Sequence, residues 1–227
     1  MASRMADIRS SRLGRSSARP RGWMLAALAL AGAALAATLA AEQIPRRQRI
    51  AFEVDIRSRF THAPVLVIGD SIAHEAAQDS LCGDAVFNAA VPADRLANLL
   101  ARAPALFARV RPRRVVVAIG VNDSPRPHRS IETWRADYLD LVAAFEGADL
   151  VLVEVNPVDP RASDYVRRLD QDFIAGQNAA IRAIARQVGA RVVPAPLKAS
   201  TRDGLHPSTA GAALWRTRLA DAACSAP

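Results

Sequence analysis

Four separated segments place residues used in nucleophilic catalysis at the ends of predicted elements. The first is Gly69-Asp70-Ser71, which follows the apolar run 65–68 and precedes a helical stretch. The run predicts a buried strand, so Ser71 lies between a strand's carboxyl end and a helix's amino end. Ligands gather there in open α/β sheets, and the helix start favours negative charge. A nucleophilic serine suits this position, although Gly-Asp-Ser also suits an ordinary turn with Ser as the N-cap.

The second motif, Asp203-Gly204-Leu205-His206, sets a carboxylate three residues before an imidazole. In a short loop, Asp203 can accept a hydrogen bond from the His206 ring and fix its tautomer. The other ring nitrogen is then free to take a proton from a serine. Pro207 suits the first turn of a helix predicted over 208–220. Alone, the motif also fits a loop that caps this helix, but together with Ser71 it predicts a Ser–His–Asp triad.

Two further strand ends offer hydrogen-bond donors. The run 114–120 predicts a buried strand, and Asn122 follows it, so the Asn122 amide reaches the edge where Ser71 lies and can stabilise an oxyanion. The segment 85–91 predicts a short strand that offers backbone N–H groups near the same edge. Either segment alone fits a strand followed by an Asn turn. Four strand ends with these groups in this order indicate chemistry rather than core packing.

With these motifs the chain resembles the SGNH (GDSL-type) hydrolase superfamily over about residues 64–222. The resemblance implies a carboxylic-ester hydrolase that needs no metal or organic cofactor. It also implies that Ser71 is the nucleophile, His206 the general base and Asp203 its orienting carboxylate. Asn122 matches the oxyanion-hole amide of the family.

One position departs from the family pattern. The second block of the family usually reads Asn-Ala-Gly, with the glycine N–H in the oxyanion hole beside that of Ser71. Here the block reads Asn88-Ala89-Ala90, so Ala90 stands where glycine is expected. An alanine N–H donates equally well at negative φ, whereas positive φ would cost roughly 1 kcal/mol or more and displace the donor. We expect negative φ and a complete hole.

The order of the remaining elements indicates the fold class. The sequence predicts helices over 131–145 and 163–188 and strands over 149–155 and 191–193. This alternation predicts a parallel sheet between two helix layers, a three-layer α/β/α domain over 63–227. The resemblance implies the flavodoxin-like arrangement of SGNH hydrolases.

The N-terminal region has a different composition. Residues 1–22 carry six Arg and one Asp and predict a disordered basic tail. Residues 23–41 are an uncharged run of nineteen residues, which as a helix would span about 28 Å, close to a bilayer's hydrocarbon core. The basic flank predicts a signal anchor in the inner membrane, a juxtamembrane stalk over 42–62 and a periplasmic catalytic domain. Small residues near 36–41 leave a cleaved signal peptide and secretion to the periplasm as the alternative.

The charge distribution fits a membrane partner rather than nucleic acid. The chain has a formal net charge of +8, of which residues 1–22 contribute +5 and residues 42–50 contribute +2. The excess therefore flanks the apolar run, as membrane topology and anionic headgroups require. No face that combines aromatic and basic residues is visible in the sequence, so we expect no nucleic-acid partner.

The two cysteines, Cys82 and Cys224, lack the spacing of metal ligands. In an oxidising compartment they can pair, since helices after the first and last strands can lie on one face of the sheet. Two unpaired thiols are the alternative.

Several other polar residues are expected near the catalytic edge or in solvent. His74, three residues after Ser71, shares its helix face and can line the pocket. Glu154 and Asn156 end a strand at the same edge and can also border the pocket, whereas His128 is expected to be solvated.

These observations predict a membrane-tethered serine esterase that acts on a small-molecule or carbohydrate ester. Small acyl esters, such as acetyl groups on envelope carbohydrate, are favoured because the chain lacks insertions able to build a long lipid tunnel. Two alternatives stay open. The acyl-enzyme could pass its acyl group to a sugar hydroxyl, as in an O-acyltransferase. The domain could also be a catalytically weak envelope-binding module, although the complete set of triad residues and Asn122 argues against this.

Overall fold

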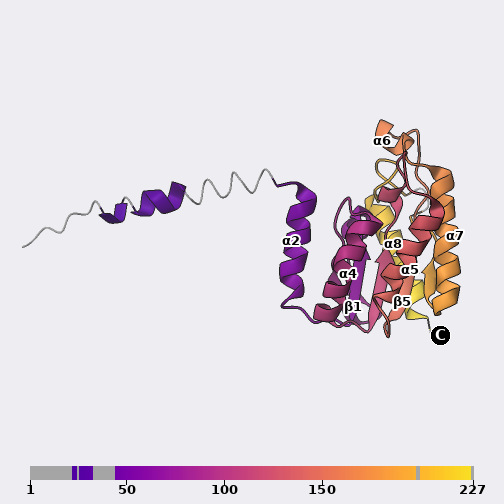
Figure 1. Ribbon diagram of the computed structural model, residues 1–227, viewed down its shortest axis with the longest axis horizontal. Coiled ribbons are helices and arrows are strands. Elements are labelled where there is room, and N and C mark those ends of the chain that lie inside the picture. The colour runs from indigo at the N-terminus through magenta and orange to yellow at the C-terminus, as the bar shows by residue number, and fades with distance from the viewer. Residues whose placement is uncertain (1–21, 25, 33–43, 198–199, 226–227) are drawn as a thin grey trace, which may run out of the picture. The chain divides into compact units, whose positions relative to one another are not determined.

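The computed structural model describes residues 22–24, 26–32, 44–197 and 200–225 (Figure 1). They fall into two compact units, 1–44 and 45–227, and each is considered by itself. In the first unit, the described residues 22–24 and 26–32 are helical. The rest of the predicted tail and of the predicted membrane segment lies outside the described residues. Within the described part of the chain, no helix is long and apolar enough to cross a membrane.

The second unit is built on a six-stranded sheet with the order β2-β3-β1-β4-β5-β6. The strands are β1 (Val65–Gly69), β2 (Ser80–Leu81), β3 (Asp84–Asn88), β4 (Arg114–Ala118), β5 (Asp149–Val153) and β6 (Arg191–Val193). All neighbours pair in parallel except β2 and β3, which are antiparallel. The central strands read as nearly continuous Val, Leu and Ile because both faces of a parallel sheet are buried. The α/β/α class predicted from the sequence is confirmed.

The strand order explains why ligands would meet the sheet between β1 and β4. From β1 the chain moves outward to β3, and then crosses to β4 on the other side of β1. Adjacent loops therefore leave β1 and β4 in opposite directions, which opens a crevice at the carboxyl ends of these strands. Ser71 follows β1 and Asn122 follows β4, so both residues lie at this edge.

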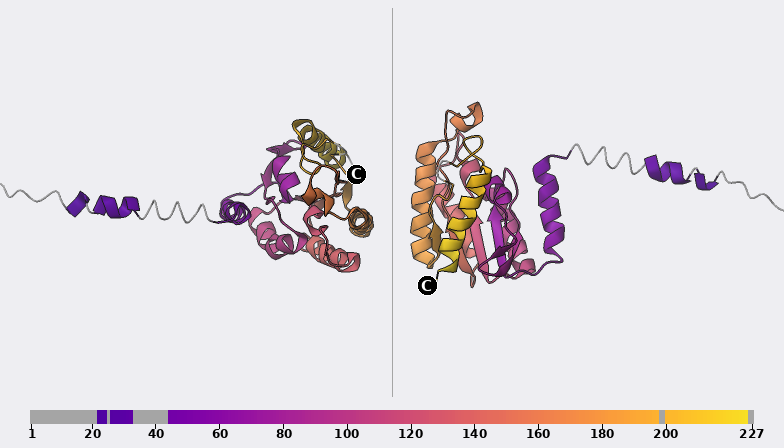
Figure 2. Two further views of the ribbon diagram at one scale, coloured as in Figure 1. Left: turned by 90° about the horizontal axis from the view of Figure 1, so that it is seen from above. Right: turned by 180° about the vertical axis from the view of Figure 1, so that it is seen from behind.

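Helices cover both faces of the sheet (Figure 2). They are α2 (Arg46–Ser58), α3 (Ser71–Glu75), α4 (Leu96–Val110), α5 (Ile131–Ala143), α6 (Asp164–Arg167), α7 (Gln171–Val188) and α8 (Thr209–Cys224), with a 3₁₀ turn, η1, over Val121–Asp123. Helices α4, α5 and α7 lie on one face and α8 on the other. Helices α4, α5 and α7 connect successive parallel strands from β3 to β6, and these connections all move in the same direction across the sheet. Because such crossovers are right-handed, their helices lie on the same face.

The predicted helix over 163–188 is two helices. Asp170 interrupts it and caps α7, since its carboxylate accepts hydrogen bonds from the backbone N–H groups at the start of that helix. The same carboxylate binds Arg126 at 2.7 Å and His128 at 2.9 Å. His128 also stacks on Phe173, with ring centroids 4.1 Å apart. His128 is exposed, as predicted, although the contacts with Asp170 and Phe173 hold its ring in place.

Part of the segment predicted as a stalk is helical and packs on the domain. Helix α2 buries Val54 and Ser58 and contacts α4. Ion pairs reinforce this contact, with Asp55 bound to Arg109 of α4. At the other end of the chain, α8 begins after its N-cap Ser208 and runs four residues beyond the predicted end.

The two cysteines form a disulfide that joins the short β2–β3 hairpin to the last residue of α8. Cys82 and Cys224 are 142 positions apart in the sequence. Their pairing matches the expectation that the elements after the first strand and after the last strand share one face of the sheet.

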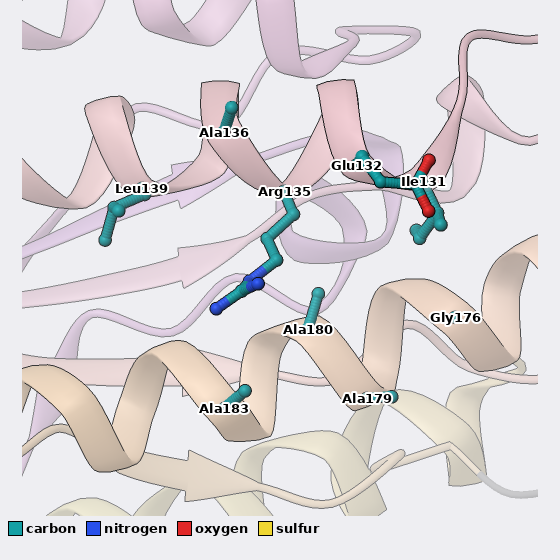
Figure 3. Close-up of a pocket in the computed structure, with 9 residues that line it drawn as sticks. All are labelled: Ile131, Glu132, Arg135, Ala136, Leu139, Gly176, Ala179, Ala180 and Ala183. Carbon is teal, nitrogen blue, oxygen red and sulfur yellow. The ribbon is translucent and has the colours of Figure 1, made fainter.

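A hollow of about 680 Å³ lies between α5 and α7, away from the motifs (Figure 3). The side chains that line it are mostly small or apolar (Ile131, Glu132, Arg135, Ala136, Leu139, Gly176, Ala179, Ala180 and Ala183). None of the residues with catalytic chemistry belongs to this lining.

Candidate active site

Ser71 is the first residue of α3 and follows β1 through a tight connection. Asp70 is the N-cap of α3, and its side chain accepts a hydrogen bond from the N–H of Ile72 at 3.0 Å. Glycine is required at position 69, because a Cβ atom there would lie 2.2 Å from the carbonyl oxygen of Ala118 on β4. The close approach of β1 to β4 thus fixes the position of the serine.

The structure brings Ser71, His206 and Asp203 into one hydrogen-bonded chain. Ser71 Oγ lies 3.1 Å from Nε2 of His206, and Nδ1 of His206 lies 2.8 Å from Oδ2 of Asp203. A carboxylate only accepts hydrogen bonds, so Nδ1 carries the hydrogen and Nε2 presents a lone pair to the serine hydroxyl. This is the arrangement that the sequence motifs predict.

The Asp203 carboxylate is held by its own loop. Its Oδ1 accepts hydrogen bonds from the backbone N–H groups of Leu205, at 3.1 Å, and His206, at 2.7 Å. Partial burial would raise the pKa of Asp203, but the hydrogen bonds from His206 and Leu205 outweigh it and hold the pKa below its usual value. Gly204 turns the loop at a φ of +80°, where a Cβ would also lie 2.4 Å from the side chain of Ala162.

Asn122 is buried in η1, directly after β4. One hydrogen of its Nδ2 group is donated to the backbone carbonyl of Asp94 at 3.0 Å, while Oδ1 accepts a weak hydrogen bond from the Tyr165 hydroxyl at 3.4 Å. The second Nδ2 hydrogen has no acceptor among the described residues. Asn122 therefore has one oriented N–H group left for a ligand.

The Ala90 N–H group is engaged within its own turn. Among the described residues, positive φ outside glycine occurs at Cys82, Ala93 and Arg111 only, so Ala90 has the expected negative φ. Its N–H nevertheless donates to Oδ1 of Asn88 at 2.9 Å. The backbone conformation is as expected, and the N–H already has an acceptor in this conformation. A hole that includes the Ala90 N–H stays a prediction.

A buried ion-pair network supports these donors and was not visible in the sequence. Asp94 is fully buried and binds Arg47 of α2 at 2.9 Å and Arg102 of α4 at 2.8 Å. Arg102 also donates to the carbonyl oxygen of Ala89 at 2.8 Å. Since the Asp94 backbone holds Asn122, one network ties the Asn122 amide and the turn before Ala90 to α4.

Two other carboxylates, the buried Asp70 and the half-buried Asp123, accept hydrogen bonds from backbone N–H groups at helix starts. Burial raises the pKa of Asp70 to about 7, and the nearby Asp123 and Asp94 charges add to the rise. Burial also raises the pKa of Asp123, whose side chain accepts the N–H of Leu96 at the start of α4. These contacts assign Asp70 and Asp123 to the support of strand ends and helix starts.

The three residues expected to border the pocket lie in different surroundings. His74 faces an open groove, and its Nδ1 hydrogen bonds to the Ala90 carbonyl at 3.2 Å. Glu154 is buried against Arg182, and Asn156 accepts the N–H of Leu197 at 2.6 Å. Glu154 and Asn156 therefore brace the loop after β6. Both line a cavity of about 20 Å³, room for about one water molecule.

The described residues offer no evident metal-binding site. Within the described ranges, no three His, Cys, Asp or Glu side chains converge as a metal-binding group. The groups available at the edge of β1 and β4 are thus a hydroxyl, an imidazole paired with a carboxylate, and an amide.

Comparison with known proteins identifies the family of the chain. Residues 67–214 match the profile of the GDSL-like lipase/acylhydrolase family. None of the curated proteins matches the chain significantly.

Solved structures share the fold at low sequence identity. A protein from Streptococcus pneumonia, provisionally described as a platelet activating factor, aligns with a TM-score of 0.68 and 20% identity over 83% of this chain and 98% of its own. A lipase/acylhydrolase from Enterococcus faecalis aligns with a TM-score of 0.58 and 18% identity over 69% and 93%. An acetyl-xylooligosaccharide esterase mutant from Geobacillus stearmophilus aligns with a TM-score of 0.57 and 17% identity over 71% and 94%.

Proposed function

The chain belongs to the GDSL-like lipase/acylhydrolase family, and from that premise we propose that it hydrolyses carboxylic esters through an acyl-enzyme formed on Ser71. The observation that carries the proposal is the hydrogen-bonded chain from Ser71 Oγ to His206, at 3.1 Å, and from His206 to Asp203, at 2.8 Å. A serine hydroxyl is a weak nucleophile on its own, and an adjacent base of fixed tautomer is what activates it.

The proposed reaction uses His206 first as a base and then as an acid. As Ser71 Oγ bonds to the ester carbonyl carbon, its proton moves to Nε2 of His206. The tetrahedral intermediate collapses when the bond to the alcohol oxygen breaks, and His206 gives the proton to that oxygen. Water then repeats the sequence on the acyl-enzyme, which releases the carboxylic acid and restores the serine. Asp203 stabilises the imidazolium at both stages.

The negative oxygen of the tetrahedral intermediate needs hydrogen-bond donors that are already oriented. Two are available at this edge. The N–H of Ser71, at the start of α3, has no acceptor among the described residues, and Asn122 has its second amide hydrogen. Ala90 becomes a third donor when Asn88 releases its N–H.

We propose small acyl esters, such as acetyl groups on envelope carbohydrate, as the substrates. The lack of insertions able to build a long acyl tunnel supports this choice. That a solved structure of the same fold is an acetyl-xylooligosaccharide esterase agrees with it.

The test uses the full chain in neutral detergent with p-nitrophenyl acetate, butyrate and octanoate. We expect kcat/KM to be highest for acetate and to fall as the acyl chain lengthens, and Ser71→Ala to abolish all three activities. A preference for octanoate would overturn the short-acyl assignment. Hydrolysis that never exceeds the Ser71→Ala background would overturn the esterase assignment itself.

We further propose that residues 23–41 anchor the protein in the inner membrane, with the catalytic domain in the periplasm. The nineteen-residue uncharged run and the six arginines before it support this topology.

A further inference from the structure

A second hollow of about 680 Å³ opens beside the catalytic loop. Its charged and polar lining comes from four elements: Arg46 at the start of α2, His74 and Glu75 on α3, Arg202 and Pro207 in the catalytic loop, and Arg216 on α8. We call this the arginine groove. Pro207 directly follows His206, and His74 lies three residues after Ser71 on α3, so the groove lies beside the two segments that carry the reacting groups.

The arginine groove carries more positive than negative charge. Its one lining carboxylate, Glu75, is already bound by both terminal nitrogens of Arg202, at 2.6 and 3.0 Å. Arg46 and Arg216 pair with no acidic side chain in the described part of the chain. A second carboxylate, Asp203, lies 3.9 Å from Arg202 and is held by the catalytic loop. Two guanidinium groups therefore remain without a counter-charge.

This excess is local. Residues 51–227 have a formal net charge of only +1, so the clustering of arginines does not follow from a generally basic domain. Several arginines elsewhere in the domain form ion pairs, as Arg114 and Arg191 do with Asp149. In the groove, Arg46 and Arg216 come from distant parts of the sequence and line one hollow without such a partner.

The start of a neighbouring helix favours an anion in the same place. The sixteen-residue helix α8 begins at Thr209, which lines the groove, and the positive end of its dipole therefore faces the hollow. Arginine forks bind phosphate and carboxylate groups through paired, charge-assisted hydrogen bonds.

We propose that the arginine groove binds an oxyanionic group, a phosphate or a carboxylate, on the alcohol part of the ester. The inference rests on the proposed function and adds a substrate class to it. The alcohol side is assigned because His206 must deliver its proton to the leaving oxygen, so the alcohol lies on the His206 side of the serine. Arg202 and Pro207 flank His206 on the groove side. The enzyme thus selects esters whose alcohol part carries a phosphate or carboxylate group.

The test compares three acetates that differ only in the alcohol: phenyl acetate, 4-acetoxybenzoate and 4-acetoxyphenyl phosphate. With the full chain in neutral detergent, we expect kcat/KM for the anionic acetates to exceed that for phenyl acetate by at least tenfold. The double variant Arg46→Gln/Arg216→Gln should lose this advantage and keep phenyl acetate hydrolysis within about twofold. Arg218→Gln, on the same helix but outside the groove lining, is the matched control. Comparison of 4-acetoxybenzoate with 4-acetoxyphenyl phosphate shows whether the groove prefers a carboxylate or a phosphate.

The proposal would be overturned if the ratio of kcat/KM for the anionic acetates to kcat/KM for phenyl acetate were the same in the wild type and the double variant. Binding of phenyl phosphate, measured by calorimetry, separates this failure from a failure of the proposed function, because phenyl phosphate has no ester carbonyl. Suppose that no acetate is hydrolysed, but that phenyl phosphate binds the wild type and binds the double variant at least tenfold more weakly. The groove assignment then stands and the esterase assignment falls. If phenyl phosphate binds both proteins equally or neither, the groove assignment falls.

Discussion

The N–H of Ala90 donates a hydrogen bond to Oδ1 of Asn88 across 2.9 Å, in the turn where the family places an oxyanion donor. The Nδ2 group of Asn88 in turn donates to the carbonyl oxygen of Ala73 at 3.0 Å. The Asn88 side chain is therefore held at both ends. In this conformation the donors left for an oxyanion are the N–H of Ser71 and the free amide hydrogen of Asn122.

This arrangement predicts that Asn122 carries much of the oxyanion stabilisation. Asn122→Ala should lower kcat by about 10²–10³-fold with little change in KM, because the amide matters chiefly when the oxygen becomes negative. Ala90→Gly should change kcat by less than about threefold, since position 90 already has negative φ. Steady-state kinetics on p-nitrophenyl acetate measure both. A large rate gain in Ala90→Gly with a silent Asn122→Ala would show that the hole is built differently.

The triad prediction concerns covalent labelling and rate. A fluorophosphonate probe should label the wild type and Ser208→Ala, a control at the neighbouring N-cap of α8, but not Ser71→Ala. His206→Ala should lower kcat by about 10⁴–10⁶-fold, and Asp203→Asn by about 10⁴-fold, by analogy with other triads. Labelling that survives Ser71→Ala would exclude this serine, and a His206→Ala enzyme of normal rate would exclude the base.

The short-range parts of the site were predictable from the sequence because local chemistry fixes them. An apolar β-branched run that ends in Gly-Asp-Ser specifies a strand-to-helix turn. Asp203 and His206 meet because they lie three positions apart in a tight loop. Likewise, runs of Val, Leu and Ile separated by amphipathic stretches specify a parallel sheet with helices on both faces.

The tertiary parts were not predictable. The Asp94 network joins residues from α2, from α4 and from the loop before it, and no spacing in the sequence marks these partners. Tyr165 reaches Asn122 from α6, 43 positions away. The break at Asp170 was missed because a helix period continues through it, and the partners that favour the cap, Arg126 and His128, lie far off in the sequence.

The disulfide should contribute substantially to stability. It closes a loop between residues 142 positions apart, and cross-links of long loops typically stabilise a fold by about 2–4 kcal/mol through the unfolded chain. Reduction should therefore lower the free energy of unfolding in urea by about that amount. The double variant Cys82→Ser/Cys224→Ser should match the reduced wild type and be insensitive to reductant. Unfolding curves that coincide with and without reductant in the wild type would contradict this role.

The membrane topology predicts where a fusion partner is active. A reporter that functions only in the periplasm, fused after residue 62, should be active, and the full chain should stay with membranes after a carbonate wash. The matched control replaces two leucines of the apolar run, Leu28→Arg/Leu30→Arg, and should lose both properties. Release of a shortened protein would favour a cleaved signal peptide, and an inactive reporter would contradict the proposed topology.

Asp70 predicts a specific dependence of stability on pH. Its pKa is raised by burial from an ordinary 3.8 to about 7, so between about pH 4 and pH 7 the folded protein binds more protons than the unfolded chain. Asp70 therefore stabilises the folded protein fully below about pH 4, where its carboxyl group is protonated. This contribution to the free energy of unfolding is lost as the pH rises to about 7, by at most about 1.4 kcal/mol per pH unit.

Asp70→Asn isolates this contribution, because an amide oxygen can still accept the Ile72 N–H and cannot ionise. Urea unfolding at pH 4.5, 5.5, 6.5 and 7.5 should show the variant gaining stability relative to the wild type as the pH rises. Asp140→Asn, on the exposed side of α5, controls for the loss of one carboxylate and should show no such trend. Parallel stability curves for the wild type and Asp70→Asn would mean that the buried carboxylate is ionised throughout, stabilised by the helix start of α3 more strongly than burial opposes it.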